Sequence, residues 1–284
     1  MQMKVIKTVV EMKNFVRMVK KSGKTIGLVP TMGALHKGHL TLMKAAKQKC
    51  DIVIASVFVN PTQFGPNEDF AAYPREFESD CVKLESVGVD AVFHPEASEL
   101  YPENYTAYVT VDGDITSKLC GAKRPGHFRG VATVVTKLFN ITEADHAFFG
   151  QKDAQQVVVI KRFVRDLNIN VAVEMVPIVR DENGLALSSR NKYLSAAEKE
   201  AALVLSASLK ATKEAYTKGE KNVAVLKSLL TKQIQAEPLA DIDYVEIYSF
   251  PDLEEIEMIK GQAIIALAVR FGKTRLIDNA IIGG

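Results

Sequence analysis

The sequence predicts an α/β fold in which a doubly wound parallel sheet is followed by a smaller α/β domain. Short apolar runs alternate with helix-like apolar spacing from the N-terminus to Val176. The turn signal Asp181-Glu182-Asn183-Gly184 then interrupts this alternation. A chain of 284 residues is also long enough for two unequal domains with separate cores. We therefore expect one domain over residues 1–178 and a second over residues 179–284.

The first domain is expected to begin with a strand or turn and an amphipathic helix within residues 1–24. A βαβ unit follows, with a strand at 25–30, a glycine-containing turn, a helix at 38–49 and a strand at 52–59. Its right-handed crossover brings the turn to the carboxyl edge of the sheet, where α/β folds bind ligands. The alternation continues with helices at 75–87, 130–139 and 154–167 and strands at 91–93, 147–149 and 170–176. This order predicts a Rossmann-like sheet.

The second domain is expected to be smaller and to cover the active site. Ser195 with Glu198 three positions later forms a capping-box pattern, which predicts a helix over 196–218. A second helix is expected at 223–236, and strands at 244–249, 263–269 and 275–277.

Charge and cysteine content limit the possible partners and compartment. The formal net charge is only +2, so no large field attracts nucleic acid or a membrane, and neither is expected as a partner. Three widely spaced cysteines favour a reducing cytoplasm over a disulfide framework or a zinc cluster. The N-terminal segment lacks the continuous apolar stretch of a signal peptide or membrane span. A cytoplasmic protein is therefore expected.

Two histidines occupy the first predicted βα turn, in the segment His36-Lys37-Gly38-His39. A glycine permits close backbone approach, and the N–H groups at the start of the helix can receive phosphate. Histidines three residues apart there can point to one side and donate hydrogen bonds to phosphate oxygens. Surface decoration and a metal pair are the alternatives, although metal pairs are more often spaced i, i+4. The place in the first βα turn favours phosphate.

Two later segments have the chemistry to complete a nucleotide site. Residues 149–156 again place a glycine between a strand and a helix, where Lys152 can meet phosphate and Asp153 can accept from ribose hydroxyls. A solvated helix start with a favourable acid is the alternative for this pair. Residues 187–191 carry two hydroxyls and the guanidinium of Arg190, which can grip phosphate, although serine-rich strings are usually ordinary loops.

Taken together, these motifs resemble the HIGH-type nucleotidyltransferase superfamily, in which a His-x-Gly-His turn and a later serine-containing loop bracket ATP. Longer segments are similar to the pantoate–β-alanine ligase family. These segments are Pro30-Thr31-Met32-Gly33-Ala34-Leu35-His36-Lys37-Gly38-His39, Val57-Phe58-Val59-Asn60-Pro61-Thr62-Gln63-Phe64, Arg124-Pro125-Gly126-His127-Phe128-Arg129-Gly130 and Phe149-Gly150-Gln151-Lys152-Asp153. One departure is Leu187, where that family often has methionine of similar volume.

The resemblance implies roles for the matching positions. His39, His36, Lys152 and Arg190 would be catalytic. ATP would be bound by Met32, Gly33, Ala34, Leu35, His36, Lys37, Gly38, His39, Gly150, Gln151, Lys152, Asp153, Val179, Leu187, Ser188, Ser189 and Arg190. Gln63 and Gln156 would hold pantoate, with Asn60 nearby, because a neutral amide both donates and accepts without neutralising the attacking carboxylate. Without the resemblance, Gln63 would be taken for a turn residue.

The same resemblance implies the reaction and its partners. ATP would be a substrate with pantoate and β-alanine, the reaction would pass through a pantoyl adenylate, and Mg²⁺ would bridge phosphate oxygens. The protein ligands of the metal stay open, because surface solvation explains Glu78 and Asp80 as well as metal binding does. A homodimer formed through the first domain is also implied.

Three other functions are compatible with parts of the pattern. Another HIGH-type nucleotidyltransferase would need further Arg or Lys contacts to a phosphorylated acceptor. A tRNA-synthetase-like protein would show a basic surface or an added RNA-binding domain, against which the balanced charge argues. A catalytically inactive ATP sensor is disfavoured by the intact His36, His39, Lys152 and Arg190.

Overall fold

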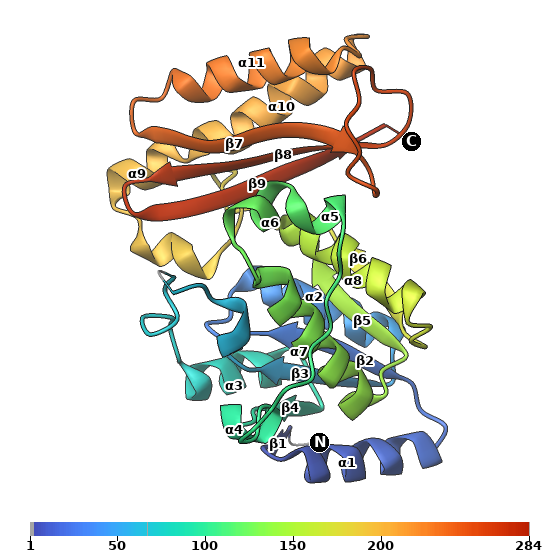
Figure 1. Cartoon of the computed structure of the whole chain (residues 1–284). Coiled ribbons are helices and arrows are strands. Elements are labelled where there is room, and N and C mark those ends of the chain that lie inside the picture. Colours follow the sequence, from blue (N-terminus) through green and yellow to red (C-terminus); the bar gives the residue numbers. More distant parts are fainter. Residues whose placement is uncertain (1–2, 67, 284) are drawn as a thin grey trace.

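The chain folds into two α/β parts, each built on its own sheet (Figure 1). The computed structural model describes residues 3–66 and 68–283. The larger sheet has six parallel strands, in the order β1-β4-β3-β2-β5-β6, and the smaller has three antiparallel strands, in the order β7-β8-β9. The predicted fold class is therefore confirmed. The strands are β1 (Lys4–Ile6), β2 (Ile26–Thr31), β3 (Ile52–Val57), β4 (Ala91–Phe93), β5 (His146–Gly150), β6 (Ala172–Val176), β7 (Ala240–Ser249), β8 (Ala263–Phe271) and β9 (Thr274–Ile282).

Helices connect these strands. The longer ones are α1 (Val9–Lys21), α2 (Lys37–Lys49), α3 (Phe77–Ser86), α7 (His127–Thr142), α8 (Ala154–Asp166), α10 (Leu203–Thr217) and α11 (Val223–Gln235). The short ones are α4 (Ala97–Leu100), α5 (Asp114–Ser117), α6 (Leu119–Lys123), α9 (Ala196–Ala201) and the 3₁₀ turns η1 (Pro61–Gln63), η2 (Gln151–Asp153) and η3 (Ser189–Tyr193). Among the described residues, no helix combines the length and the apolar character needed to span a membrane.

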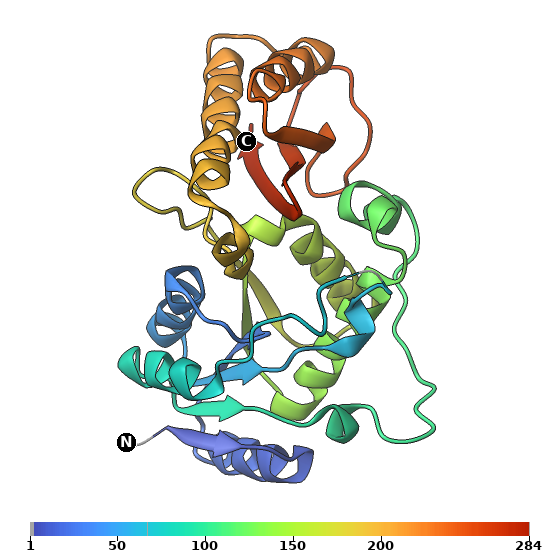
Figure 2. The same cartoon turned by 90° about the vertical axis from the view of Figure 1, so that its left-hand side faces the viewer.

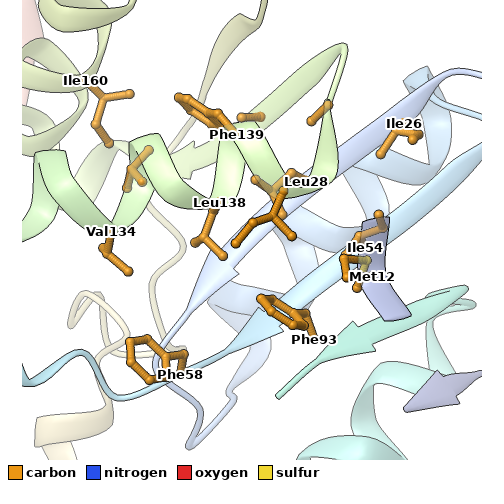
Figure 3. Close-up of a cluster of buried hydrophobic side chains, with 14 of the residues drawn as sticks. Met12, Ile26, Leu28, Ile54, Phe58, Phe93, Val134, Leu138, Phe139 and Ile160 are labelled. Carbon is orange, nitrogen blue, oxygen red and sulfur yellow. The ribbon is translucent and has the colours of Figure 1, made fainter. Parts of the chain in front are cut away.

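Helices cover both faces of the large sheet (Figure 2). One face packs against α1, α7 and α8, and the other packs against α2 and α3. Leu28 and Ile54 of the central strands are fully buried in the first of these clusters, where Leu28 meets α7 and Ile54 lies beside Met12 of α1 (Figure 3). Burying one such side chain contributes roughly 1.5–3 kcal/mol. Burial on both faces explains why the central strands are almost continuously apolar.

The order of the strands determines where the ligand-binding crevice lies. From β2 the chain builds outward through β3 and β4 on one side, and β5 then pairs with the other side of β2. The connections leaving β2 and β5 diverge at this switch point, so a crevice opens beyond their carboxyl ends. The histidine turn follows β2 and the Lys152 segment follows β5, so both lie at this crevice.

The smaller sheet is covered on both faces. α10 and α11 pack on the face turned away from the large sheet (Figure 1). On the other face, Ile264 and Ala266 of β8 pack against Ala154 and Val158 of α8. The C-terminal part therefore rests on the helix that begins at the nucleotide segment. Its division from the first domain at residues 178 and 179 stays a prediction.

The structure differs from the predicted elements mainly in their lengths. The helix predicted over 196–218 is divided into α9 and α10, because Leu205 N–H bonds back to Ala202 in a tight turn between them. β9 is longer than the predicted 275–277, because its buried polar residues Asp278 and Asn279 have partners that the local pattern does not reveal. Finally, α7 begins at His127, three residues earlier than predicted.

Candidate active site

A cavity of about 240 Å³ lies beyond the carboxyl ends of β2 and β5. Its wall contains fifteen of the predicted site residues, which come from both halves of the chain. They are Met32, His36, Gly38, His39, Asn60, Gln63, Gly150, Lys152, Asp153, Gln156, Val179, Leu187, Ser188, Ser189 and Arg190. Five predicted residues are absent from this wall, namely Gly33, Ala34, Leu35, Lys37 and Gln151.

The two histidines cap the start of α2 with their own rings. His36 Nδ1 accepts the Gly38 N–H at 3.1 Å, and His39 Nδ1 accepts the His36 N–H at 3.3 Å. The ring centroids lie 4.1 Å apart. Because each Nδ1 is an acceptor, the proton of each neutral ring lies on Nε2. Each ring thus offers one N–H donor on the side away from its cap.

Both rings are held in the neutral form. Burial, and then the nearby charge of Lys152, lower the pKa of His36 to about 4. Burial also holds the pKa of His39 well below its ordinary value, with further lowering from His36 and Lys152. Desolvation disfavours the imidazolium, and a neighbouring cation disfavours it further. At neutral pH the turn therefore presents two neutral N–H donors.

The backbone of the same turn is bound by the carboxylate of Asp80, which is not part of the cavity wall. Asp80 has no exposed area, and its two carboxylate oxygens accept the N–H groups of Ala34 and Leu35, each at 2.8 Å. Surface solvation, one of the two sequence-based explanations for Asp80, is therefore wrong for this residue. These two N–H groups already have an anionic partner, so binding of a nucleotide phosphate falls to side chains of the cavity.

The Lys152 segment reaches the cavity through η2, directly after β5. Lys152 and Asp153 both line the wall, and their charged groups are 3.5 Å apart. Gln151 turns instead to the small sheet, where its Nε2 donates to Asn279 Oδ1 at 3.2 Å. Asn279 in turn donates to the backbone oxygens of Gln151 and Lys152 at 2.9 and 3.0 Å. β9 therefore fixes the backbone that carries the lysine.

The serine loop enters the cavity from a hairpin-like segment. Leu187 N–H bonds to the Val179 oxygen at 3.0 Å, which places these two apolar residues side by side on the wall. Ser188 then accepts the Arg190 N–H at 3.3 Å. Burial alone would lower the pKa of Arg190, but the hydrogen bonds and charge of Asp69 raise it above its ordinary value. Arg190 is therefore a fixed cation at the wall.

The amide residues form a second polar region of the same cavity. Asn60 is 1% exposed, and its Nδ2 donates to Gln63 Oε1 at 3.0 Å and to the Gly130 oxygen at 3.2 Å. Its Oδ1 accepts from Tyr101 at 2.8 Å. Asn60 thus orients Gln63, whose amide nitrogen lies 3.2 Å from Met32 Sδ. Gln156 lines the wall from the first turn of α8.

Several cavity residues were not singled out as site residues from the sequence. His127 contacts the Gln63 oxygen through Nδ1 at 2.9 Å and Arg124 through Nε2 at 2.9 Å. Burial and the charge of Arg124 lower the pKa of His127 to about 4. The signal that could have found this pair is the Arg124–Gly130 motif, which contributed only to the resemblance. An apolar wall was also missed, made by Phe58, Val131, Val134, Val135 and Leu138.

The order of the strands, the histidine turn after β2 and the cation-lined cavity define this chain as an α/β enzyme of the nucleotide-binding class. The family model of pantoate–β-alanine ligase matches residues 4–281. The chain belongs to the pantoate–β-alanine ligase family, and it is therefore a ligase that joins pantoate to β-alanine.

Relatives from other organisms agree with this assignment along the whole chain. The pantothenate synthetase of Pelotomaculum thermopropionicum is 57% identical over 281 residues, with 99% of each chain covered. The crystal structure of pantothenate synthetase from Thermus thermophilus has a TM-score of 0.93 at 43% identity, covering 98% of this chain and 99% of that one. The structure of a Francisella tularensis pantoate–β-alanine ligase, complexed with β-γ ATP and β-alanine, has a TM-score of 0.79 at 34% identity. It covers 98% of this chain and 97% of its own.

Proposed function

We propose that this ligase works in two steps within the cavity beyond β2 and β5. A carboxylate oxygen of pantoate attacks the α-phosphorus of ATP, and the bond from that phosphorus to pyrophosphate breaks. The amine of β-alanine then attacks the acyl carbon of the pantoyl adenylate, the bond to AMP breaks, and the amine releases a proton. The Francisella tularensis relative solved with β-γ ATP and β-alanine supports both as substrates here.

One observation carries this proposal: a single cavity holds phosphate-binding groups, an amide pair and an apolar wall. His36 and His39 would donate Nε2–H to phosphate oxygens, and Lys152 and Arg190 would neutralise the charge that builds up on them. Neutral histidines suit this task, because they donate hydrogen bonds at neutral pH without needing protonation. His39 would contact the reacting phosphate, and His36 would support it.

The nucleoside would lie between the two segments that follow β5 and β6. Val179 and Leu187 provide adjacent apolar contacts for the adenine, and Asp153 provides acceptors for the ribose hydroxyls. Gly150 allows close approach, since no heavy atom lies within 4 Å of where its side chain would begin. Met32, Gly38, Ser188 and Ser189 would complete this part of the wall. Gly33, Ala34, Leu35, Lys37 and Gln151 would act through the backbone that supports it.

Pantoate would occupy the region of the amide pair. Gln63, oriented by Asn60, and Gln156 would bind its hydroxyl and carboxylate oxygens. The two methyl groups of pantoate match the branched apolar wall that includes Val134 and Leu138. Because the amides are neutral, they would orient the carboxylate while leaving it nucleophilic.

Mg²⁺ is proposed to bind together with ATP. Among residues 3–66 and 68–283, no group of three His, Cys, Asp or Glu side chains is placed to hold a metal ion. Magnesium commonly binds through substrate phosphates and water with only one or two carboxylates. Asp153 is the carboxylate on this wall, 48% exposed and next to Lys152. Bound Mg²⁺ would neutralise part of the triphosphate charge.

We also propose that the enzyme acts in the cytoplasm as a homodimer formed through its first domain. The free cysteines Cys50, Cys81 and Cys120 support a reducing compartment. The dimer rests on the family resemblance, and sedimentation measurements test it.

The two-step reaction is tested by isotope exchange between pyrophosphate and ATP. With pantoate and Mg²⁺ but without β-alanine, the enzyme should exchange label, and omission of pantoate should abolish the exchange. A preparation that forms pantothenate without catalysing this exchange would overturn the adenylate. A folded preparation that forms no pantothenate would overturn the proposed function itself.

A further inference from the structure

A buried carboxylate fixes the catalytic turn from the side opposite the cavity. Asp80 lies in the first half of α3, and its two oxygens accept the N–H groups of Ala34 and Leu35 at 2.8 Å each. Asp80 is fully buried and is not part of the cavity wall. Among the described residues, Lys83 alone forms an ion pair with it, with Nζ 3.5 Å from Oδ1. Each oxygen of the carboxylate thus accepts a backbone N–H of the turn.

The backbone conformation of the turn explains why an acid is needed. Gly33 and Ala34 have φ angles of 85° and 50°, so two successive residues are left-handed. The successive N–H groups of Ala34 and Leu35 converge on the carboxylate, as those of a turn can do on an anion, and we call this turn the nest. A Cβ added to Gly33 would lie 3.0 Å from Asp80 Oδ2, so the acid approaches a position that only glycine leaves open. The conformation of Ala34 is unfavourable by itself, and the two hydrogen bonds hold it in place.

The histidines follow directly from this nest. Leu35, whose N–H is bound by Asp80, immediately precedes His36, and the His36 N–H binds His39 Nδ1. A continuous series of contacts therefore runs from Asp80 through the turn to both rings. We infer that Asp80 is a positioning residue for the ligase reaction: its acceptor-only carboxylate sets where His36 and His39 meet the phosphates. This inference rests on the proposed role of these histidines.

The first test exchanges one carboxylate oxygen for an NH₂ group of nearly equal size. Asp80→Asn places a donor against one of the two backbone N–H groups, so the turn must shift. Pyrophosphate–ATP exchange should fall about 10- to 100-fold, because small misplacements of reacting groups have effects of this size. The KM for pantoate should stay close to the wild-type value, since Gln63 and Gln156 lie on other elements. A folded Asp80→Asn enzyme with wild-type exchange would overturn the inference.

Asp90→Asn is the matched control for a merely structural role. Asp90 also accepts a backbone N–H, from Val53 at 2.7 Å, and pairs with Lys47 at 3.0 Å, but it lies before β4 at the opposite edge of the sheet. This variant should lose stability and keep its exchange rate. If both variants lose exchange in proportion to their loss of stability, Asp80 has no special positioning role and the inference is overturned.

The second test restores the anion from solution. A separate cavity of about 280 Å³ is lined by Asp80, Gly33 and Met32, so Asp80→Ala should leave a space that formate can enter. Sodium formate should restore part of the exchange, whereas sodium chloride at equal ionic strength should not. If formate restores no exchange in Asp80→Ala, the inference is overturned. This second test does not require the Asp80→Asn variant to fold. A His39→Ala arm separates the two claims. Normal exchange by that variant removes His39 from the mechanism whatever the Asp80 variants do, whereas a loss of exchange there with wild-type exchange in Asp80→Asn overturns the Asp80 inference alone.

Discussion

Arg190 and Asp69 form a two-pronged ion pair at the wall of the nucleotide cavity. Arg190 Nε donates to Asp69 Oδ2 at 3.1 Å, and Nη2 donates to Oδ1 at 2.8 Å. The two side chains are 31% and 27% exposed. This is the geometry in which a guanidinium also binds phosphate, so Asp69 occupies the donors that ATP needs.

Asp69→Asn should therefore strengthen ATP binding. Removing the competing charge is worth about 0.5–1 kcal/mol for a partly exposed pair, or a roughly two- to five-fold lower KM for ATP. Steady-state kinetics with ATP as the varied substrate measures this. The control is Glu76→Gln, because Glu76 pairs with Lys192 between the same two segments at 2.6 Å while neither residue lines this cavity. A higher KM for ATP in Asp69→Asn alone would show that Asp69 supports Arg190 instead of competing for it.

The neutral histidines predict an unusual pH dependence of activity. A catalytic histidine of ordinary pKa would lose its neutral form near pH 6.5. His36 has a pKa of about 4 and that of His39 is also far below the ordinary value, so both stay neutral as the pH falls through 6. The exchange rate should therefore show no acidic limb with a midpoint near 6.5. A limb at that pH, absent from His36→Asn, would contradict the assigned charge state.

Unlike activity, stability should depend on pH between about 4 and 6.5. The unfolded chain takes up protons on these histidines near pH 6.5, whereas folded His36 does so only near 4. The unfolded state therefore binds more protons between these values, and the free energy of unfolding falls as pH is lowered through this window. His36 contributes a slope of about 1.4 kcal/mol per pH unit there. Urea unfolding at several pH values should give a shallower slope for His36→Asn, whose side chain still caps the helix.

The sequence predicted the large sheet well because its signals are local. The apolar runs at β2 and β3, and the glycine turn between β2 and α2, follow from neighbouring residues. The histidine turn and the Lys152 segment were singled out because they follow strands that end at one edge of the sheet. Gln63, Gln156 and Val179 were named only through the family resemblance.

The contacts that complete the site were not predictable in this way. Asp80 binds a residue 46 positions away, Asp69 one 121 positions away, and Asn279 one 127 positions away. Each is a single polar residue in an element that looks like a solvated surface or an ordinary strand when considered alone. Only the packing of the elements reveals that these side chains are partnered, because hydrogen-bond partners over such separations leave no periodic pattern.

His39→Ala should abolish most adenylate formation while the protein stays folded. The change removes an N–H donor to the reacting phosphate, and loss of one such donor typically costs 10²–10³-fold in rate. Pyrophosphate–ATP exchange measures the loss, and circular dichroism reports the fold. His146→Ala is the control, because His146 lies at the start of β5 and pairs with Glu174 at 3.1 Å, away from the cavity. Near-normal exchange by His39→Ala would remove His39 from the mechanism.

Asn279 should affect ATP binding from the smaller sheet. Its amide donates to the backbone oxygens of Gln151 and Lys152, and it is 5% exposed, so Asn279→Ala leaves two partly buried carbonyls without this partner. We expect a loss of roughly 1–3 kcal/mol in unfolding free energy. The KM for ATP should rise because the segment carrying Lys152 is released, while the KM for pantoate changes little.

Two further variants decide whether this effect comes from the link to Lys152 or from lost stability. Asn279→Asp keeps the shape but points a carboxylate oxygen at the two carbonyls, so it should raise the KM for ATP more than Asn279→Ala does. Asn222→Ala removes the cap of α11, where Asn222 Oδ1 accepts the Val225 N–H at 3.1 Å, and should cost about 1 kcal/mol without changing either KM. If Asn222→Ala raises the KM for ATP as much as the Asn279 variants do, the effect follows global stability. If the KM for ATP rises only in the Asn279 variants, β9 positions the nucleotide segment through the hydrogen bonds of Asn279. The local sequence pattern does not predict these hydrogen bonds.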